Sequence, residues 1–184
     1  DEGYAACEAA SAGPPLEGRV GAGTGTTVGK LLGPAGACPG GVGTASVRLP
    51  GGGVVGALAV VNAVGDVHGR DGSVLAGARG PDGAPAGAMR ILLTSGRPEP
   101  PPAGSSTTLA VVATDAALDK AGCRRLAEVA QDGLALAIRP AHTPYDGDTV
   151  FAVSAGGAPA DPLALGAAAV EAMWIAIERA VTRE

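Results

Sequence analysis

A continuous apolar run, Val54–Val64 (VVGALAVVNAV), is the feature that most constrains how this 184-residue chain can fold. A run of this kind, without alternating polar residues, is typical of a strand that is buried on both faces. A second run of the same character occurs at Thr107–Thr114 (TTLAVVAT). Strands buried on both sides need a layer of structure on each side. The two runs therefore predict layered α and β structure with closely apposed sheets.

Small side chains must fill most of the core. The chain has 39 alanines and 31 glycines, and its only aromatic residues are Tyr4, Tyr145, Phe151 and Trp174. We therefore expect a core of Ala, Val and Leu with backbones close together. Glycine and proline are frequent enough to suggest disorder, but 46% of the residues are hydrophobic and the net charge is only −5. Such a chain can bury enough apolar surface to fold, and its length suits one domain or two small ones.

The remaining segments indicate a mixed β region followed by a β-α-β-α order. Asp119 and the pair Asp161-Pro162 are typical helix starts, and they predict helices to Ile138 and to about Val181. Four prolines lie close together between Gly96 and Ser106, and they predict a linker or surface loop. The other expected elements are a helix over 1–12, loops over 18–33 and 65–88, and strands over 42–49, 89–94 and 149–154.

Composition argues against several classes of protein. With 13 basic and 18 acidic residues, the chain lacks the excess of positive charge that is typical of nucleic-acid-binding proteins. No apolar run approaches the ~20 residues of a membrane span. Three widely spaced cysteines and two histidines predict no disulfide framework, no metal site and a reducing, cytoplasmic location. No signal peptide is visible. The opening in mid-helix without a methionine leads us to expect further residues upstream.

The glycine-rich segment 18–33 does not have the pattern of a nucleotide site. A phosphate loop needs Gly, four residues, then Gly-Lys and Ser or Thr, whereas Gly29-Lys30 is preceded by Thr24 and followed by Leu31. We expect no nucleotide and no other cofactor. Lys30 is nonetheless unusual, because it is the only lysine before residue 120 and adjoins two leucines. It is either a solvated lysine or part of a site.

A group of hydroxyl residues, 105–108, lies where the proline-rich segment meets the second buried-type strand. The simpler interpretation is a strand start or cap. The other is self-cleavage, in which the Thr107 hydroxyl attacks the carbonyl of the preceding peptide bond. Hydrolysis of the resulting ester would leave Thr107 as a new N-terminus. Its own α-amine, with an ordinary pKa of ~7.7–8.0, could then act as the base, so no catalytic histidine would be needed.

Two further places carry polar groups in apolar surroundings. Asp146 and Asp148 flank Gly147 just before the strand expected at 149–154. The pair is either a turn with solvated carboxylates, a calcium-binding loop, for which the sequence evidence is weak, or two carboxylates in one hydrogen-bond network. Asn62 lies inside the first apolar run, where an amide needs partners. It is either a structural hydrogen-bonding group or a donor to a reaction oxyanion.

Together these segments resemble the autoprocessing L-aminopeptidase/D-amidase-esterase family, which includes β-aminopeptidases and nylon-oligomer hydrolases. The resemblance covers nearly the whole chain after residue 18. The matching stretches are GRVGAGTGTTVGKLLG (18–33), GTASVRLP (43–50), VVGALAVVNAVGDV (54–67), TTLAVVATDAALDK (107–120) and RPAHTPYDGDTVFAVS (139–154).

The resemblance implies a four-layer α-β-β-α sandwich, similar to N-terminal-nucleophile hydrolases and ornithine acetyltransferase. It implies one domain over 1–184, cut between Ser106 and Thr107 into 1–106 and 107–184, and assembled as a homo-oligomer of processed pairs. The implied substrates are small peptides, amides or esters. Thr107 would be the nucleophile and Asn62 the oxyanion donor. Asp146 and Asp148 would orient the amine of Thr107. Lys30 would help the nucleophile or assist the processing step.

The chain departs from the family pattern in two places. Ser106 stands where the threonine branch carries asparagine, which leaves Ser106 itself as an alternative nucleophile. Family members also carry a long N-terminal region with the first sheet strands and a substrate-pocket tyrosine. Without that region, strands of buried type are expected to be exposed, and the isolated chain to be poorly soluble or inactive. The alternative functions are an acyltransferase of related fold and a catalytically inactive, truncated fragment.

Overall fold

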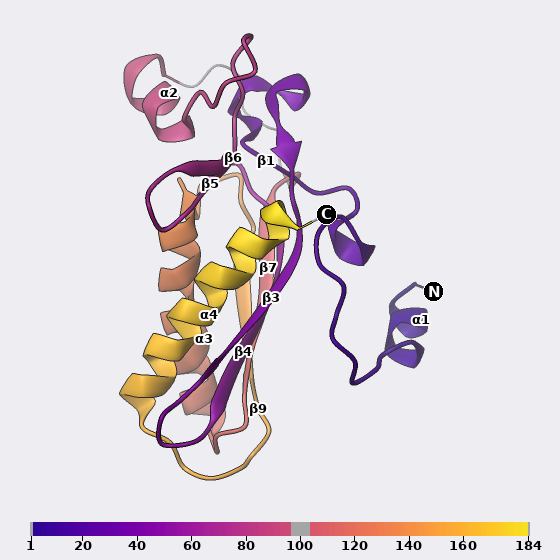
Figure 1. Ribbon diagram of the computed structural model, residues 1–184, viewed down its shortest axis with the longest axis vertical. Helices are drawn as coiled ribbons and strands as arrows, with labels where there is room; N and C mark the ends of the chain where they lie inside the picture. Colours follow the sequence, from indigo (N-terminus) through magenta and orange to yellow (C-terminus); the bar gives the residue numbers. More distant parts are fainter. Residues whose placement is uncertain (1, 97–103, 184) are drawn as a thin grey trace.

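A four-stranded sheet forms the centre of the computed structural model, which describes residues 2–96 and 104–183 (Figure 1). Its strands are β3 (Gly41–Arg48), β4 (Val54–Asn62), β7 (Thr107–Thr114) and β9 (Thr149–Ser154), and they lie side by side in that order. β3, β4 and β7 are antiparallel, whereas β7 and β9 are parallel. Parallel neighbours need a crossover connection, and helix α3 (Lys120–Ala137) supplies it.

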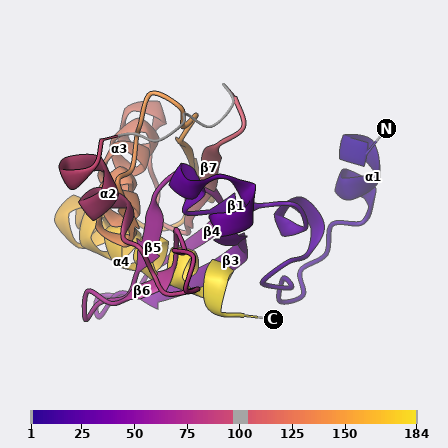
Figure 2. The ribbon, with the colours of Figure 1, turned by 90° about the horizontal axis from the view of Figure 1, so that it is seen from above.

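Two long helices, α3 and α4 (Pro162–Thr182), cover one face of this sheet (Figures 1 and 2). Both begin as the sequence predicts: the Asp119 carboxylate accepts a hydrogen bond from Gly122 N, and Asp161 accepts from Leu163 N and Ala164 N. Such caps satisfy backbone donors that have no partner in the first helical turn. The helices, β3, β4 and β7 enclose the main apolar core.

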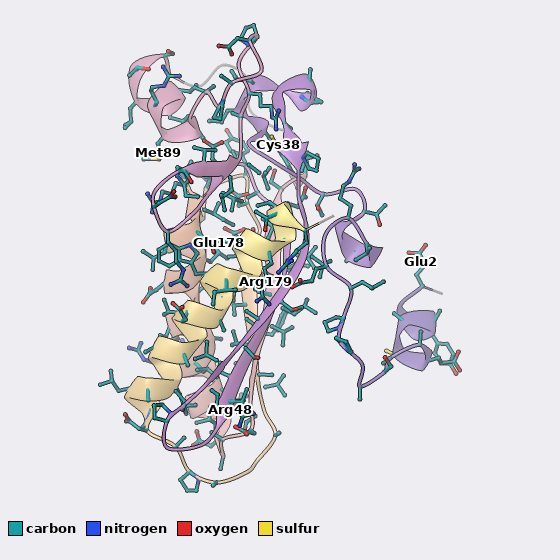
Figure 3. The ribbon with its side chains drawn as sticks, in the orientation of Figure 1. Glu2, Cys38, Arg48, Met89, Glu178 and Arg179 are labelled. Atoms are coloured by element: carbon teal, nitrogen blue, oxygen red, sulfur yellow. The ribbon has the colours of Figure 1, made fainter. Side chains whose placement is uncertain are left out.

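Helix α4 lies almost directly on the backbone of β3. A Cβ atom on Gly43 would overlap the carbonyl oxygen of Ala176, and one on Gly41 would overlap that of Ala180. Nearby, Arg179 reaches from the helix to the strand and donates from Nη1 to the Thr44 carbonyl oxygen at 2.8 Å (Figure 3). The close backbones expected from the composition are therefore present between these two elements.

Smaller elements gather beyond the end of the central sheet that carries the start of β7 (Figure 1). Strand β1 (Thr27–Val28) pairs with β2 (Cys38–Pro39), and β5 (Asp66–His68) pairs with β6 (Val74–Ala76) and β8 (Ile138–Arg139). Helix α2 (Ala88–Thr94) and the 3₁₀ turns η1 (Gly21–Gly23), η2 (Lys30–Leu32) and η3 (Pro34–Gly36) complete this region. The N-terminal helix α1 (Glu2–Glu8) has no buried residue and lies apart from the sheet (Figures 1 and 2).

Two sequence-based predictions in this region are wrong. Residues 89–94 form helix α2 rather than a strand, and the expected loop 65–88 contains β5 and β6. The reason is the buried carboxylate of Asp66. It accepts from Ala88 N at 2.5 Å, where α2 begins, and from Ala78 N at 2.8 Å, just after β6. Most of the proline-rich linker expected at 96–106 lies outside the described residues.

Replacing Asp66 with alanine is expected to lower the free energy of unfolding by about 2–4 kcal/mol. Asp66 is fully buried, and its loss leaves two buried N–H donors without an acceptor, each costing roughly 1–3 kcal/mol. Urea unfolding monitored by circular dichroism measures the change. Asp82→Ala is the matched control, because Asp82 also accepts from a backbone N–H, that of Ala84, but at an exposed turn. Equal effects of both substitutions would contradict the prediction.

The second face of the central sheet is open among the described residues. Leu109, Phe151 and Val153 are 47%, 57% and 52% exposed on neighbouring strands β7 and β9. Along β4, buried residues alternate with half-buried ones, so the prediction that this strand is covered on both faces is wrong for this chain. The helices bury only one side. The expectation that strands of a buried type are exposed here is confirmed.

Candidate active site

The five residues singled out in the sequence lie together at one end of the central sheet. Thr107 begins β7 and is paired in register with Asn62, the last residue of β4. Ser106 forms a parallel bridge with Asp146, just before β9. Lys30 reaches Asn62 from turn η2, and Asp148 contacts the backbone next to Thr107. Segments that are far apart in sequence therefore bring one lysine, one amide, two carboxylates and the hydroxyl junction into one cluster.

Lys30 is held by carbonyl and hydroxyl groups rather than by solvent. Its Nζ atom lies 2.8 Å from Asn62 Oδ1, 3.0 Å from the Asn62 carbonyl oxygen, 2.8 Å from the Ser105 carbonyl oxygen and 3.2 Å from Ser106 Oγ. Burial lowers the pKa of Lys30, and the charge of nearby Asp146 partly opposes that shift. The solvated-lysine interpretation is therefore wrong.

Asn62 has partners for both ends of its side-chain amide. Its Oδ1 atom accepts from Lys30 Nζ and from Thr27 N at 3.1 Å, and its Nδ2 donates to the Ser105 carbonyl oxygen at 3.0 Å. The two acceptor contacts fix which way the amide points. Lys30 and Asn62 thus present two donors to one carbonyl oxygen, that of Ser105.

The peptide bond between Ser106 and Thr107 carries a different set of contacts. Thr107 Oγ1 donates to the Ser106 carbonyl oxygen at 2.5 Å, and Gly147 N donates to the same oxygen at 3.1 Å. The Thr107 hydroxyl therefore contacts the carbonyl group of the peptide bond that joins Ser106 to Thr107. A backbone N–H on the oxygen is the kind of donor that stabilises a developing oxyanion.

Asp146 is half-buried and accepts from two sides. Its Oδ1 atom accepts from Val64 N at 3.1 Å, and its Oδ2 accepts from Thr143 Oγ1 at 2.5 Å. Burial raises the pKa of Asp146, and the charge of Asp148 adds to the rise, while these hydrogen bonds oppose it. The lowered pKa of Lys30 and the raised pKa of Asp146 make the neutral form of each group easier to reach than in water.

The side chain of Asp148 is buried, with 3% of it exposed. Its Oδ1 atom accepts from Thr108 N at 2.7 Å. Its Oδ2 accepts from His142 N at 3.0 Å and lies 3.1 Å from His142 Nδ1. Asp148 therefore ties the loop around His142 to the residue that follows Thr107.

Sequence reasoning missed three contributors to this site. The Gly147 N–H lies on the Ser106 carbonyl oxygen, Thr143 holds Asp146, and His142 holds Asp148. A backbone donor leaves no signal in residue type, although a glycine between two carboxylates does hint at a close approach. No pattern of Ser, His and Asp in the sequence singles out His142.

Replacing Gly147 with alanine is expected to lower the rate of any reaction of Thr107 by about 10- to 100-fold, because small misplacements of reacting atoms are costly. A Cβ atom at this position would lie only 2.8 Å from Thr107 Oγ1. The hydroxyl would have to move. The rate of chain cleavage, followed by intact mass, measures the effect. Gly51→Ala is the control, since nothing lies near a Cβ there, and an equal rate in both variants would contradict the prediction.

Among residues 2–96 and 104–183 there is no group of three or more His, Cys, Asp or Glu side chains that could hold a metal ion. In the same residues, no helix is long and apolar enough to cross a membrane.

The geometry and the sequence agree with one family. A model of peptidase family S58 matches residues 1–183, and the chain belongs to this family. It is 43% identical over 170 residues to an uncharacterised aminopeptidase of Mycobacterium leprae, covering 84% of this chain and 43% of that protein. An uncharacterised aminopeptidase of Mycobacterium tuberculosis strain H37Rv is 44% identical over 172 residues, covering 88% and 46%. The chain thus spans less than half the length of these relatives.

Solved structures show the same fold. A Burkholderia β-aminopeptidase superposes with a TM-score of 0.67 at 29% identity, over 96% of this chain and 49% of that one. The L-aminopeptidase D-Ala-esterase/amidase of Ochrobactrum anthropi, described as a variant of the Ntn hydrolase fold, gives 0.62 at 25% identity, over 92% and 46%. The layered α/β architecture with N-terminal-nucleophile hydrolase relatives is therefore confirmed.

Proposed function

We propose that this chain is the catalytic part of a self-cleaving hydrolase of amide, peptide or ester bonds in small substrates, with Thr107 as the nucleophile. The observation that carries the proposal is the position of Thr107 Oγ1, 2.5 Å from the carbonyl oxygen of its own peptide bond, with the Gly147 N–H on that same oxygen. Membership of a peptidase family supports the reaction class.

In the self-cleavage step, Thr107 Oγ attacks the Ser106 carbonyl carbon and loses its proton. The oxyanion is stabilised by Gly147 N–H. The C–N bond then breaks, the nitrogen takes up a proton, and the Ser106 acyl group is left as an ester on Thr107. This acyl shift leaves Thr107 with a free α-amine. Water then hydrolyses the ester, so that Ser106 gains a carboxylate and Thr107 regains its hydroxyl. Lys30 and Asp146 are the groups with shifted pKa values that support these proton transfers.

In substrate hydrolysis the freed α-amine of Thr107 acts as the base for its own hydroxyl. Processing releases Ser105 and Ser106 from the strand end, and this frees the two donors that hold the Ser105 carbonyl oxygen in the uncut chain. We propose that Asn62 Nδ2 and Lys30 Nζ then bind the substrate's oxyanion. Asp146 and Asp148 orient the amine. An acyl-enzyme forms on Thr107, and water releases it.

One specific observation favours a second nucleophile, Ser106. Its hydroxyl lies 3.2 Å from Lys30 Nζ, and the carbonyl oxygen of the bond before it, that of Ser105, already has Lys30 and Asn62 as donors. A lysine of lowered pKa beside a serine is a known way to activate the hydroxyl. We keep Thr107 as the proposal, because its hydroxyl is the one in contact with the peptide bond it would cut.

Intact-mass analysis of the complete encoded polypeptide tests the proposal. The complete polypeptide is the right sample, because this chain spans less than half of its relatives and has an open apolar sheet face. We expect two pieces that meet between Ser106 and Thr107. Pieces shifted by one serine residue would assign Ser106 instead. A single uncut chain that still hydrolyses amides would refute the self-cleaving mechanism.

Assembly into oligomers and a cytoplasmic location stay predictions of the sequence. The mass of the processed particle in solution, measured by light scattering, tests the first, and fractionation of cells tests the second.

A further inference from the structure

His142 has a backbone conformation that its surroundings must hold in place. It is the only non-glycine residue with positive φ, at 53°, among residues 2–96 and 104–183. This left-handed region is unfavourable for a residue with a Cβ atom, and such residues persist where neighbouring contacts fix them. In His142 those contacts come from one group, the Asp148 carboxylate, which meets both the backbone N–H and the ring.

The ring of His142 lies close to the same carboxylate. Asp148 Oδ2 is 3.1 Å from His142 Nδ1. The ring is 43% exposed while Asp148 is 3% exposed. The histidine therefore lies over a buried carboxylate and shields it on one side.

The other oxygen of Asp148 leads to the nucleophile. Oδ1 accepts from Thr108 N at 2.7 Å, and Thr108 directly follows Thr107. A carboxylate whose Oδ2 accepts from the His142 N–H and lies against the His142 ring cannot rotate freely, so its Oδ1 fixes the peptide unit that carries the Thr107 carbonyl group. That peptide unit sets the direction in which the Thr107 hydroxyl, and the amine formed on cleavage, face the reacting carbon.

We propose that His142 is a positioning residue, which acts through Asp148 to hold Thr107 in its reactive orientation. The inference rests on the proposed function of Thr107 and adds to it a residue that makes no contact with the reacting bond. It predicts that the ring of His142, and not only the turn it occupies, is needed for full rate.

The test compares His142→Gly with His142→Asn in the complete polypeptide. Glycine adopts positive φ without cost and keeps the backbone N–H, so it preserves the turn and removes only the ring. Asparagine tolerates the same φ and still places a polar side chain with N–H groups beside Asp148. His68→Gln is the matched control, because the ring of His68, at the end of β5, lies 3.3 Å from the Gly72 carbonyl oxygen and, among the described residues, forms no hydrogen bond or ion pair with Asp148.

We expect His142→Gly to slow self-cleavage by about 10- to 100-fold, as misplacement of reacting groups does. Its processed form should show a lower kcat on a small amide such as an amino-acid p-nitroanilide, with KM within about twofold of wild type. His142→Asn should recover part of both rates, and His68→Gln should match wild type.

The outcomes separate the two levels of the proposal. A His142→Gly variant that cleaves and turns over at the wild-type rate would refute the role of His142 while leaving Thr107 in place. A variant in which KM rises and kcat is unchanged would also refute it, since that pattern means a substrate contact. A wild-type polypeptide that neither cuts itself nor hydrolyses amides would refute the proposed function and, with it, this inference.

Discussion

Thr107→Ala is expected to abolish both self-cleavage and amide hydrolysis, with losses of about 10³-fold or more for each. Removing the attacking group takes away covalent catalysis and leaves only the donors around it. Intact mass should show one uncut polypeptide after an incubation that fully processes wild type, and turnover should fall to the uncatalysed background. Thr107→Ser, which keeps a hydroxyl, should still be cut.

Thr108→Val is the matched control for this substitution. Thr108 is the next residue of β7, it is fully buried, and its hydroxyl oxygen has no hydrogen-bond partner among the described residues. Valine has nearly the same shape, so cleavage should proceed at the wild-type rate. Ser106→Ala completes the set. If Ser106→Ala stops cleavage and Thr107→Ala does not, the nucleophile is Ser106 and the assignment to Thr107 is wrong.

Lys30→Met is expected to slow self-cleavage and hydrolysis by about 10²- to 10³-fold. For hydrolysis this is the usual cost of removing one donor from the substrate's oxyanion. For self-cleavage it is the cost of losing a group that supports the proton transfers. Methionine keeps most of the length and apolar stem of lysine but donates no hydrogen bond, so the Ser105 carbonyl oxygen and Asn62 Oδ1 each lose a donor. The cleavage rate by intact mass and kcat on a small amide measure the effect.

The pH dependence of stability tests the surroundings of Lys30 separately from its chemistry. The folded-state pKa of Lys30 is lowered by burial, so between that pKa and the ordinary value near 10.5 the unfolded chain binds more protons. In that range Lys30 makes the free energy of unfolding rise with pH. Lys30→Met should remove this rise. Lys120→Met, on the exposed start of α3, is the control, and identical pH profiles for all three proteins would contradict a buried Lys30.

Much of the fold was predictable because its signals are local. The caps at Asp119 and Asp161 each satisfy backbone donors within three residues, and both helices begin where these residues stand. Strand β9 has the predicted bounds, 149–154. Helix α2 was not predictable in this way, because the carboxylate that meets its first N–H is that of Asp66, 22 residues earlier in the chain. Side-chain patterns within a window cannot show such a partner.

In the candidate site, too, some features could be predicted from the sequence and others depend on contacts between distant segments. Lys30, Asn62 and the two aspartates are recognisable as polar groups in apolar or glycine-rich surroundings, and the resemblance to a family placed them together. The contacts of the Ser106 carbonyl oxygen come from a backbone N–H and from the neighbouring hydroxyl. The contacts of Asp148 depend on the turn at His142, and the positive φ of that residue is not evident from the sequence. Backbone geometry decides these contacts, so only the structure reveals them.

The contact of α4 with β3 has a consequence for how this protein can change over evolution. At Gly41 and Gly43 the space that a methyl group would need is taken by carbonyl oxygens of the helix backbone, and a backbone cannot swing aside as a side chain can. A larger residue at either position is tolerated only if the whole helix shifts, together with α3, which packs on it. Substitution is therefore restricted where α4 meets β3, at Gly41 and Gly43, and is freer on the exposed surfaces of the helices.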